Sequence, residues 1–202
     1  MKKILAYIAF SFTAITSYAT TPLWMRDVQI SPDGTEIVFC YKGDIYKVPT
    51  EGGAATQLTT QDSYECTPVW SPDGKQIGFI IRGEVFVTSA DYATTKQITR
   101  TPANESGLSF APDNRTLAYA SERNGNWQLY LAKIARKEDP NFPNATIIKE
   151  EVLLPSTTVE RACPQFSPDG KELAFIEDRI RLMVLNLETK KVRQITDGST
   201  WY

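Results

Sequence analysis

Four aspartates recur along the chain, one in each copy of a short Ser-Pro-Asp-Gly-like segment. The copies are Ser31-Pro32-Asp33-Gly34, Ser71-Pro72-Asp73-Gly74, Ala111-Pro112-Asp113-Asn114 and Ser167-Pro168-Asp169-Gly170. Carboxylates of this kind could bind a metal or act as acids. Here, however, the proline presets φ, the aspartate can hydrogen-bond the local backbone, and glycine or asparagine accepts a left-handed conformation. We therefore interpret the aspartates as turn residues on separate repeats, which cannot converge on one metal.

Other catalytic combinations are not recognisable. The sequence has no histidine, so a serine nucleophile would lack its usual base, and no serine lies in a G-x-S-x-G motif. A Ser-Lys pair stays open. Gly52-Gly53 is an isolated pair rather than a phosphate-binding loop. We predict no catalytic, cofactor-binding or metal-binding residue and no cofactor, and whether the parent protein is an enzyme is left open.

The three cysteines are Cys40, Cys66 and Cys163. An odd number leaves at least one of them unpaired. None has CxxC spacing, and without histidine a Cys/His zinc site is excluded. Cys40 lies in an apolar segment, whereas Cys66 and Cys163 lie shortly before prolines near the start of a repeat. We interpret all three as structural.

Composition narrows the class of partner. The chain of 202 residues is 42% hydrophobic and 23% charged, as in ordinary globular proteins. The net charge is -2 and the basic residues are scattered, which argues against a nucleic-acid partner. The paired acids Glu150-Glu151 and Glu177-Asp178 are expected to be solvated surface charges.

The N-terminus has the features of a targeting segment. Lys2 and Lys3 precede an apolar stretch over residues 4–14, and Ser17-Tyr18-Ala19 offers small residues at the cleavage positions. The stretch is too short to span a bilayer, which needs about 20 residues. We predict a signal peptide over residues 1–19, export to the periplasm and no membrane attachment after cleavage.

The turn segments mark a repeat. Their offsets are 40, 40 and 56 residues, a period typical of repeat architectures. A strand follows each turn, with an aliphatic residue two positions before an aromatic one and an apolar or small residue between them. The copies are Glu36-Ile37-Val38-Phe39, Gln76-Ile77-Gly78-Phe79, Thr116-Leu117-Ala118-Tyr119 and Glu172-Leu173-Ala174-Phe175. Strands that are apolar on both faces are expected to lie between other sheets.

Each repeat contains enough sequence for four short strands, which is the size of a β-propeller blade. We predict an all-β fold of four-stranded antiparallel blades over residues 20–202, with about four blades and an incomplete ring. The blades are expected near residues 24–60, 65–100, 105–157 and 162–197. A β-sandwich is the main alternative, but it would not normally keep a constant 40-residue identity between units.

The third repeat is longer than the others by 16 residues. The excess, around residues 135–144, is charged and broken by prolines, so we expect a loop that projects from the blade. A tolerated surface insertion is favoured over a partner contact. Five aromatic residues at strand spacing are expected to pack between blades: Tyr46, Trp70, Phe86, Phe110 and Tyr130. For three tryptophans the sequence does not decide between a packing and a binding role: Trp24, Trp127 and Trp201.

The amino-acid sequences of the repeats resemble those of known protein families. Residues 68–79 resemble the propeller repeat of TolB and of tricorn-type proteases. Residues 22–26, 30–34 and 41–49, followed by Gly52-Gly53, are similar to the start of exported tricorn-like serine proteases. Residues 82–87 and 121–127 are similar to the next two blades of that group. The resemblance covers nearly all of the chain after the signal peptide.

This resemblance implies an N-terminal propeller that binds or gates peptide or protein substrates, or that scaffolds a peptidase domain. The catalytic groups would lie in a C-terminal peptidase part of the same protein. Propellers of this class usually close with six or seven blades, so four blades would leave two apolar faces open, and we predict a fragment of a longer protein. The alternatives are a TolB-like periplasmic interaction scaffold and a small-ligand or glycan-binding propeller.

Overall fold

The computed structural model describes residues 24–60 and 65–198. The predicted signal peptide and Trp201 lie outside the described residues. The described chain forms sixteen strands in four sheets of four. Blade 1 contains β1 (Arg26–Ile30), β2 (Glu36–Tyr41), β3 (Asp44–Pro49) and β4 (Thr56–Gln57), and blade 2 contains β5 (Glu65–Trp70), β6 (Gln76–Ile81), β7 (Glu84–Ser89) and β8 (Thr95–Gln97). Blade 3 contains β9 (Glu105–Phe110), β10 (Thr116–Ser121), β11 (Gln128–Ile134) and β12 (Ile148–Val152), and blade 4 contains β13 (Arg161–Phe166), β14 (Glu172–Glu177), β15 (Arg181–Asn186) and β16 (Val192–Gln194).

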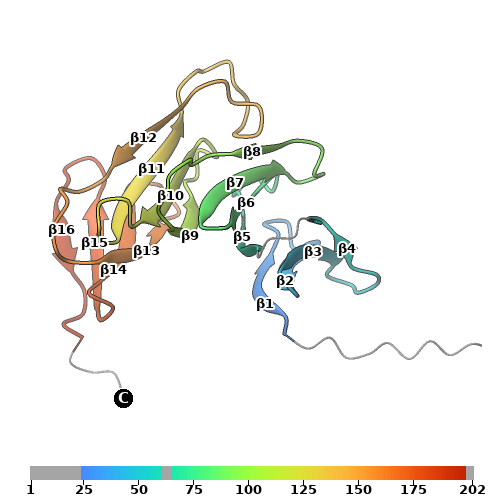
Figure 1. Ribbon diagram of the computed structural model, residues 1–202, viewed down its shortest axis with the longest axis horizontal. Coiled ribbons are helices and arrows are strands. Elements are labelled where there is room, and N and C mark those ends of the chain that lie inside the picture. Colours follow the sequence, from blue (N-terminus) through green and yellow to red (C-terminus); the bar gives the residue numbers. More distant parts are fainter. Residues whose placement is uncertain (1–23, 61–64, 199–202) are drawn as a thin grey trace, which may run out of the picture.

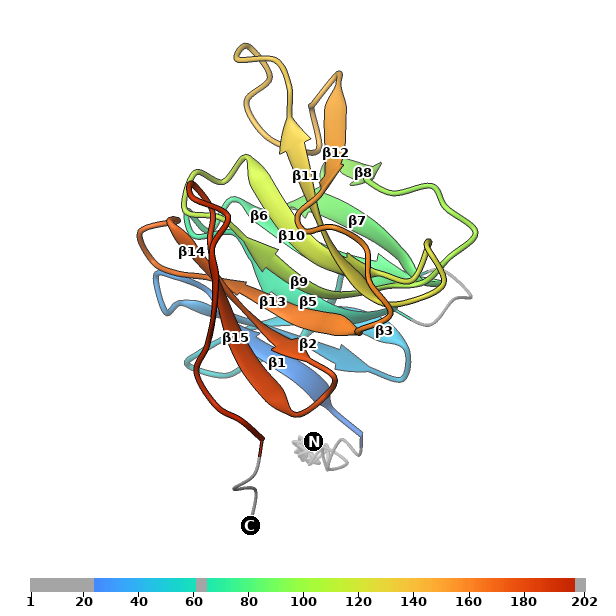
Figure 2. The ribbon, with the colours of Figure 1, turned by 90° about the vertical axis from the view of Figure 1, so that its left-hand side faces the viewer.

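Within each blade the strands are antiparallel and follow one another in chain order across the sheet. The four sheets form an arc with an opening between blade 1 and blade 4 (Figures 1 and 2). The prediction of four-stranded blades in an incomplete ring is therefore confirmed. The described residues contain no helix that is long and apolar enough to span a membrane.

The Ser-Pro-Asp-Gly segments form the turn between the first two strands of each blade. In blade 1 the Ser31 hydroxyl donates to Asp33 Oδ1 at 2.6 Å, and that oxygen also accepts from Thr35 N at 3.1 Å. The same two contacts recur in blades 2 and 4. In blade 3, where alanine replaces the serine, Asp113 accepts from the backbone N–H groups of Arg115 and Thr116. These contacts confirm the interpretation of the aspartates as turn residues.

The first strand of every blade carries a β-bulge that the sequence analysis did not predict. The residue at the bulge has a left-handed backbone conformation in each case: Asp27 (φ 51°), Thr67 (φ 52°), Gly107 (φ 63°) and Cys163 (φ 54°). A left-handed backbone is costly for residues other than glycine. Only one of the four bulges has the glycine that would have signalled it.

The two faces of a blade differ in side-chain size. In blade 2, Ile77, Phe79 and Phe86 lie on one face and pack against blade 1. Gly78 belongs to the opposite face of β6, together with Ile80 and Val85. We call these the aromatic face and the aliphatic face.

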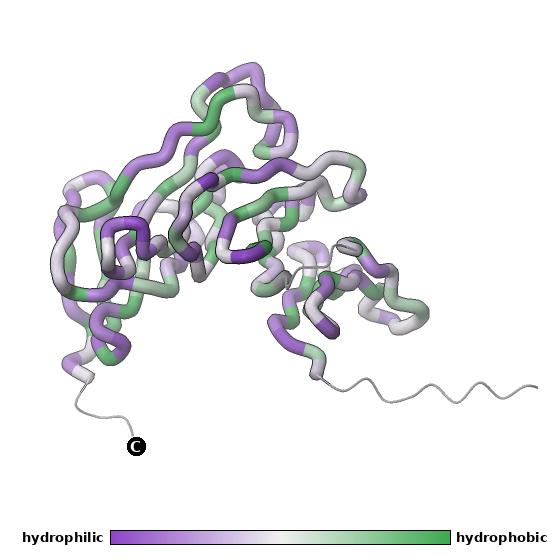
Figure 3. Tube along the Cα trace, viewed as in Figure 1, coloured by the Kyte–Doolittle hydropathy of each residue, from purple (hydrophilic) through white to green (hydrophobic). Residues whose placement is uncertain are grey.

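The same arrangement recurs at every contact between consecutive blades, which we call a joint. The aromatic face of the later blade always packs on the aliphatic face of the earlier one. Blade 3 places Leu117, Tyr119 and Tyr130 against blade 2, and blade 4 places Leu173 and Phe175 against blade 3. Figure 3 shows the corresponding hydrophobic segments along the strands, whereas many connecting loops are hydrophilic. The core is thus a series of three joints between sheets.

The insertion of blade 3 forms a hairpin tip between β11 and β12 that projects from the blade (Figure 2). The tip is nevertheless anchored. The Phe142 side chain is fully buried and lies edge to face with Phe110, with ring centroids 6.0 Å apart. Its backbone N–H donates to Gln76 Oε1 at 2.8 Å. The expectation of a simple surface loop is therefore wrong in part, because the insertion seals the joint between blades 2 and 3.

Four of the five aromatic residues expected to pack between blades do so. Phe110 and Tyr130 are buried, Phe86 stacks on Phe79, and Trp70 packs against the core between blades 1 and 2. Tyr46 differs. It stacks on Phe39 of its own blade at 5.8 Å, and it lies on the aromatic face of blade 1, over which the described residues place no further sheet.

Candidate interaction surface

A cleft of about 370 Å³ lies between blades 3 and 4, near the start of their first strands. Strands β9, β13 and β14 supply part of the lining, and three loop residues complete it. The lining residues are Ser106, Trp127, Glu160, Ala162, Cys163, Ile176 and Arg179. A volume of this size lies at the lower end of the range for small-ligand sites, and it would accept one or two side chains of a peptide.

Trp127 forms an apolar wall of the cleft, and the chain holds it in two ways. It follows a turn closed by the hydrogen bond from Gly125 N to Glu122 O at 2.9 Å, in which Gly125 has a φ of 87°. The Trp127 carbonyl then accepts from Arg161 N of blade 4 at 2.8 Å. The indole packs against the core between blades 3 and 4. Trp127 is therefore anchored to both blades that form the cleft.

The rim of the cleft is charged. Arg179 pairs with Glu160 at 3.2 Å, and its side chain is 83% exposed. The backbone supports this rim, because Asp178 N donates to the Glu160 carbonyl at 2.9 Å. One apolar wall beside an exposed ion pair is suited to a ligand with an apolar side chain and polar backbone groups, such as a peptide.

The paired acids expected at the surface are instead tied into ion pairs. Glu177 pairs with Arg161 at 3.2 Å, and their side chains are only 14% and 13% exposed. Glu150 pairs with Arg123 and accepts a hydrogen bond from the Tyr119 hydroxyl. The prediction of simply solvated charges is wrong for Glu177, whereas Glu150 is exposed at the surface as expected and also forms an ion pair. The local sequence could not show these ion-pair partners, because they lie far away along the chain.

The cysteines do not form disulfides in the described chain. Cys40 is buried, and this burial raises the pKa of its thiol to about 12. Burial also raises the pKa of Cys66. Both residues thus fit a structural role. Cys163 differs, because it is exposed at its bulge and lines the cleft.

The described residues contain no group of three or more His, Cys, Asp or Glu side chains placed to hold a metal ion. No catalytic, cofactor or metal residue was predicted from the sequence. The residues of the cleft were missed as well. The sequence analysis named Trp127 but assigned it neither a packing nor a binding role. Its partners on blade 4 follow more than 30 positions later in the chain.

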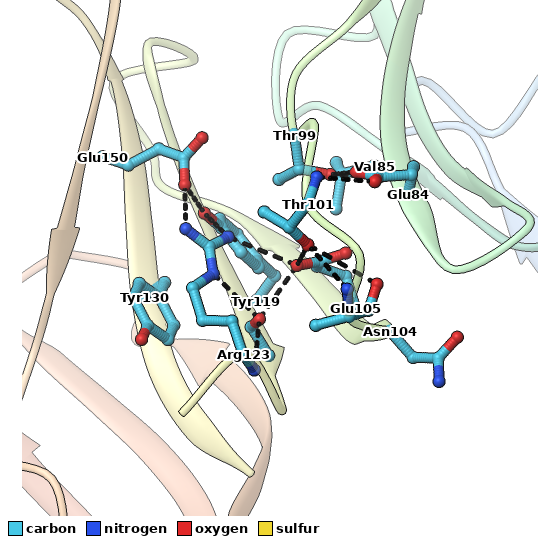
Figure 4. Close-up of polar contacts among 12 residues, drawn as sticks. Glu84, Val85, Thr99, Thr101, Asn104, Glu105, Tyr119, Arg123, Tyr130 and Glu150 are labelled. Atoms are coloured by element: carbon cyan, nitrogen blue, oxygen red, sulfur yellow. Dashed lines mark hydrogen bonds and ion pairs between the residues drawn. The ribbon is translucent and has the colours of Figure 1, made fainter. Parts of the chain in front are cut away.

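A polar network lies at the joint between blades 2 and 3 (Figure 4). Arg123 lies over the Tyr130 ring at 4.3 Å and pairs with Glu150 and with Glu105, the latter at 3.3 Å. The Glu105 side chain is fully buried, and burial raises the pKa of its carboxyl group. Its Oε1 accepts from Ser121, whereas its Oε2 has no hydrogen-bond partner among the described residues. Because Arg123, Glu150 and Glu105 Oε1 are engaged in contacts within this network, we assign the network to stability.

A threonine at the end of three repeats also has a structural role. Thr99 Oγ1 accepts from Val85 N at 2.8 Å, which satisfies the backbone at the start of the third strand of its blade. Thr59 and Thr196 make the same contact in blades 1 and 4. Blade 3 has Leu154 near this place and cannot do so.

Comparisons with known proteins support the fold. No family model matches the chain, and no curated protein matches it. Among solved structures, a TolB-like protein from Agrobacterium tumefaciens superposes with a TM-score of 0.72 at 18% identity, covering 88% of this chain and 63% of the other. The β-propeller domain of Cps50 (Swd1) from Myceliophteria thermophila gives a TM-score of 0.63 at 16% identity over 92% of this chain and 59% of the other.

A puromycin-hydrolyzing peptidase from Mycobacterium tuberculosis gives a TM-score of 0.67 at 18% identity, covering 86% of this chain and 31% of the other. The chain thus spans less than two thirds of the length of each of these structures. At such identities the similarity establishes the fold. Together with the sheet topology, it identifies the chain as a set of β-propeller blades.

Proposed function

We propose that the chain is a non-catalytic β-propeller module that binds peptide or protein segments at the cleft between blades 3 and 4. The observation that carries this proposal is the cleft itself, where the anchored Trp127 side chain meets the exposed Arg179–Glu160 pair. Rigid blades hold these loop residues in place, and propellers commonly use their loops for binding.

We further propose that the module is the N-terminal part of an exported tricorn-like serine peptidase, after removal of residues 1–19. The motif resemblance over residues 22–26, 30–34, 41–49, 68–79, 82–87 and 121–127 supports this parent protein. The fold similarity to a peptidase from Mycobacterium tuberculosis is compatible with it. In such a protein the module would admit or hold substrates, and a C-terminal peptidase part would cleave them.

A TolB-like periplasmic scaffold is the second candidate. The fold similarity to the Agrobacterium tumefaciens protein favours it. A scaffold would bind one folded envelope partner, whereas a substrate-admitting module would bind many unfolded peptides. A pull-down with a single stoichiometric partner, and no binding of unstructured peptides, would favour the scaffold.

The proposal is tested with fluorescently labelled unstructured peptides that carry aliphatic or aromatic side chains. Anisotropy should show saturable binding to the chain, and Trp127→Ala should weaken it by about tenfold or more, because the apolar wall is lost. Trp24→Ala is the matched control, since Trp24 is 74% exposed and lies away from this cleft. The chain alone should release no new peptide amino termini. Equal losses in both variants, or peptide cleavage by the chain alone, would overturn the proposal.

A further inference from the structure

The joint between blades 2 and 3 is closed at the end where the Ser-Pro-Asp-Gly-like turns lie. The Phe142 ring lies edge to face with Phe110, and the Phe142 N–H donates to Gln76 Oε1 at 2.8 Å. Asn114 contacts the same end, because its Oδ1 accepts from Asp73 N at 3.0 Å and its carbonyl accepts from Gln76 Nε2 at 2.9 Å. Gln76 is consequently only 1% exposed.

The equivalent end of the joint between blades 1 and 2 is open. Glu36 occupies the position of Gln76, and Trp70 occupies the position of Phe110. A cleft of about 330 Å³ is lined by Glu36, by Trp70 and by the turns of both blades. The Glu36 side chain is 34% exposed, in contrast to the buried Gln76. We call this space the turn cleft.

Two sequence differences leave the turn cleft open. Gly74 stands at the turn position of the asparagine in blade 3 and has no side chain to place there. The hairpin between β7 and β8 lacks the insertion of blade 3, so it provides no counterpart of Phe142. Lys47 supplies only a polar substitute, because its Nζ lies 2.8 Å from Glu36 Oε1 and 3.4 Å from the Ala90 carbonyl oxygen. The turn cleft stays open beside this ion pair.

The lining of the turn cleft is part apolar and part acidic. The Trp70 indole and the prolines of both turns supply the apolar part. Trp70 Nε1 is buried and has no hydrogen-bond partner among the described residues, and an unpaired donor of this kind is costly. The carboxylates of Asp33, Glu36 and Asp73 also line the cleft, and in the described chain only Glu36 is paired with a basic residue. This lining suits an aromatic side chain that is accompanied by positive charge.

We propose that the turn cleft binds an aromatic side chain of a peptide segment from a separate protein chain, with basic residues next to the aromatic one. The aromatic ring would lie against Trp70 as the Phe142 ring lies against Phe110, and the basic residues would face the carboxylates. Both blades that form this cleft belong to the described chain. The source of the segment rests on the proposed function, in which the module binds peptide or protein segments. The turn cleft would give such a segment a second contact, separate from the cleft between blades 3 and 4.

The probe for the test is a fluorescently labelled short peptide with one phenylalanine between two lysines. Every protein in the comparison carries Trp127→Ala, which removes the apolar wall of the cleft between blades 3 and 4. Anisotropy then measures binding at the turn cleft alone, and the probe should bind saturably. Replacing its phenylalanine by alanine, or both of its lysines by glutamates, should weaken binding by about tenfold or more.

Gly74→Asn gives this joint the side chain that Asn114 provides in the next one. Both positions have a left-handed backbone, with φ of 69° and 57°, and a Cβ on Gly74 would lie 3.6 Å from Pro32 Cδ, an ordinary contact. The variant should therefore fold, and it should weaken probe binding by about tenfold or more, because the new side chain enters the cleft. Gly34→Asn is the matched control, since it makes the same change in the turn of blade 1, where a Cβ would meet no atom within 4 Å. This control should bind the probe like the parent.

Thermal unfolding checks that both asparagine variants are folded. Selective loss of binding in Gly74→Asn would support the turn cleft. Equal affinities of Gly74→Asn and its parent, equal losses in both asparagine variants, or an alanine probe that binds as tightly as the phenylalanine probe would overturn it. A probe that fails to bind the Trp127→Ala protein would also overturn it, but would leave the proposed function at the cleft between blades 3 and 4 intact.

Discussion

The two central blades and the two outer blades have the same repeat sequence but different environments. In blades 2 and 3, every residue of β6 and β10 is buried. In blade 4, the equivalent strand β14 has two buried and four half-buried residues. In blade 1, the equivalent strand β2 has three buried residues of six, and all five residues of its first strand β1 are exposed. Each repeat therefore encodes a blade with two apolar faces. The presence of a blade on either side decides whether both faces are buried.

The largest expected effect contrasts one repeat position in a central and an outer blade. Leu117→Ala in β10 removes a completely buried side chain from the joint between blades 2 and 3, and we expect a loss of about 2–5 kcal/mol in the free energy of unfolding. Ile37→Ala, at the equivalent position on the open face of blade 1, should cost about 1 kcal/mol or less, because Ile37 is only partly buried. Urea unfolding measures both. Equal losses would break the distinction between central and outer blades.

A smaller effect is expected when a side chain is added instead of removed. Gly78→Ala should cost about 1–3 kcal/mol, because the new methyl group would press on Phe110 and Val69. Ala174→Val, at the equivalent position of blade 4, should change the free energy of unfolding by less than about 0.5 kcal/mol, because Ala174 is only half-buried. Thermal unfolding of both variants makes the comparison. A tolerated Gly78→Ala would mean that the joint has spare volume.

The smallest effect concerns the polar network of blade 3, in which a carboxylate, Glu105, is buried where blade 4 has the cationic Arg161 at the equivalent position. Burial raises the pKa of Glu105 in the folded chain, so the folded state favours the protonated form. The associated stability is present at low pH and is lost as the pH rises through the raised pKa. Wild type should therefore lose stability relative to Glu105→Gln as the pH increases from 4 to 7.

Urea midpoints measured at several pH values give this difference. Glu51→Gln, an exposed carboxylate in the turn after β3, is the control. A difference between wild type and Glu105→Gln that does not change with pH would contradict the assignment of a buried, ionisable Glu105 to this joint.

The sequence predicted much of the fold, because the period and the turn chemistry are local signals. Ser31 and Asp33 contact each other two positions apart, so their role could be inferred without a structure. The bulge at Thr67 could not be inferred, since a β-branched residue is an unusual choice for a left-handed backbone. The anchor at Phe142 was missed because its partner Gln76 lies 66 positions earlier in the chain.

The candidate site was less predictable than the fold. Its wall and rim come from loops of two blades, and only the closing of the joint brings Trp127 beside Arg179. No spacing rule connects these residues. The two faces of a blade, in contrast, could be read from Ile77-Gly78-Phe79, but the sequence did not show which face points to the preceding blade.

The most direct test of the parent protein is the denatured mass of the native product that carries the N-terminus of this chain. It is measured by immunodetection and intact mass spectrometry of the source cells. A product several times larger than 22.7 kDa is predicted, since we place these blades at the start of a tricorn-like peptidase. A product no larger than 22.7 kDa would contradict this parent protein and leave the TolB-like scaffold as the better account.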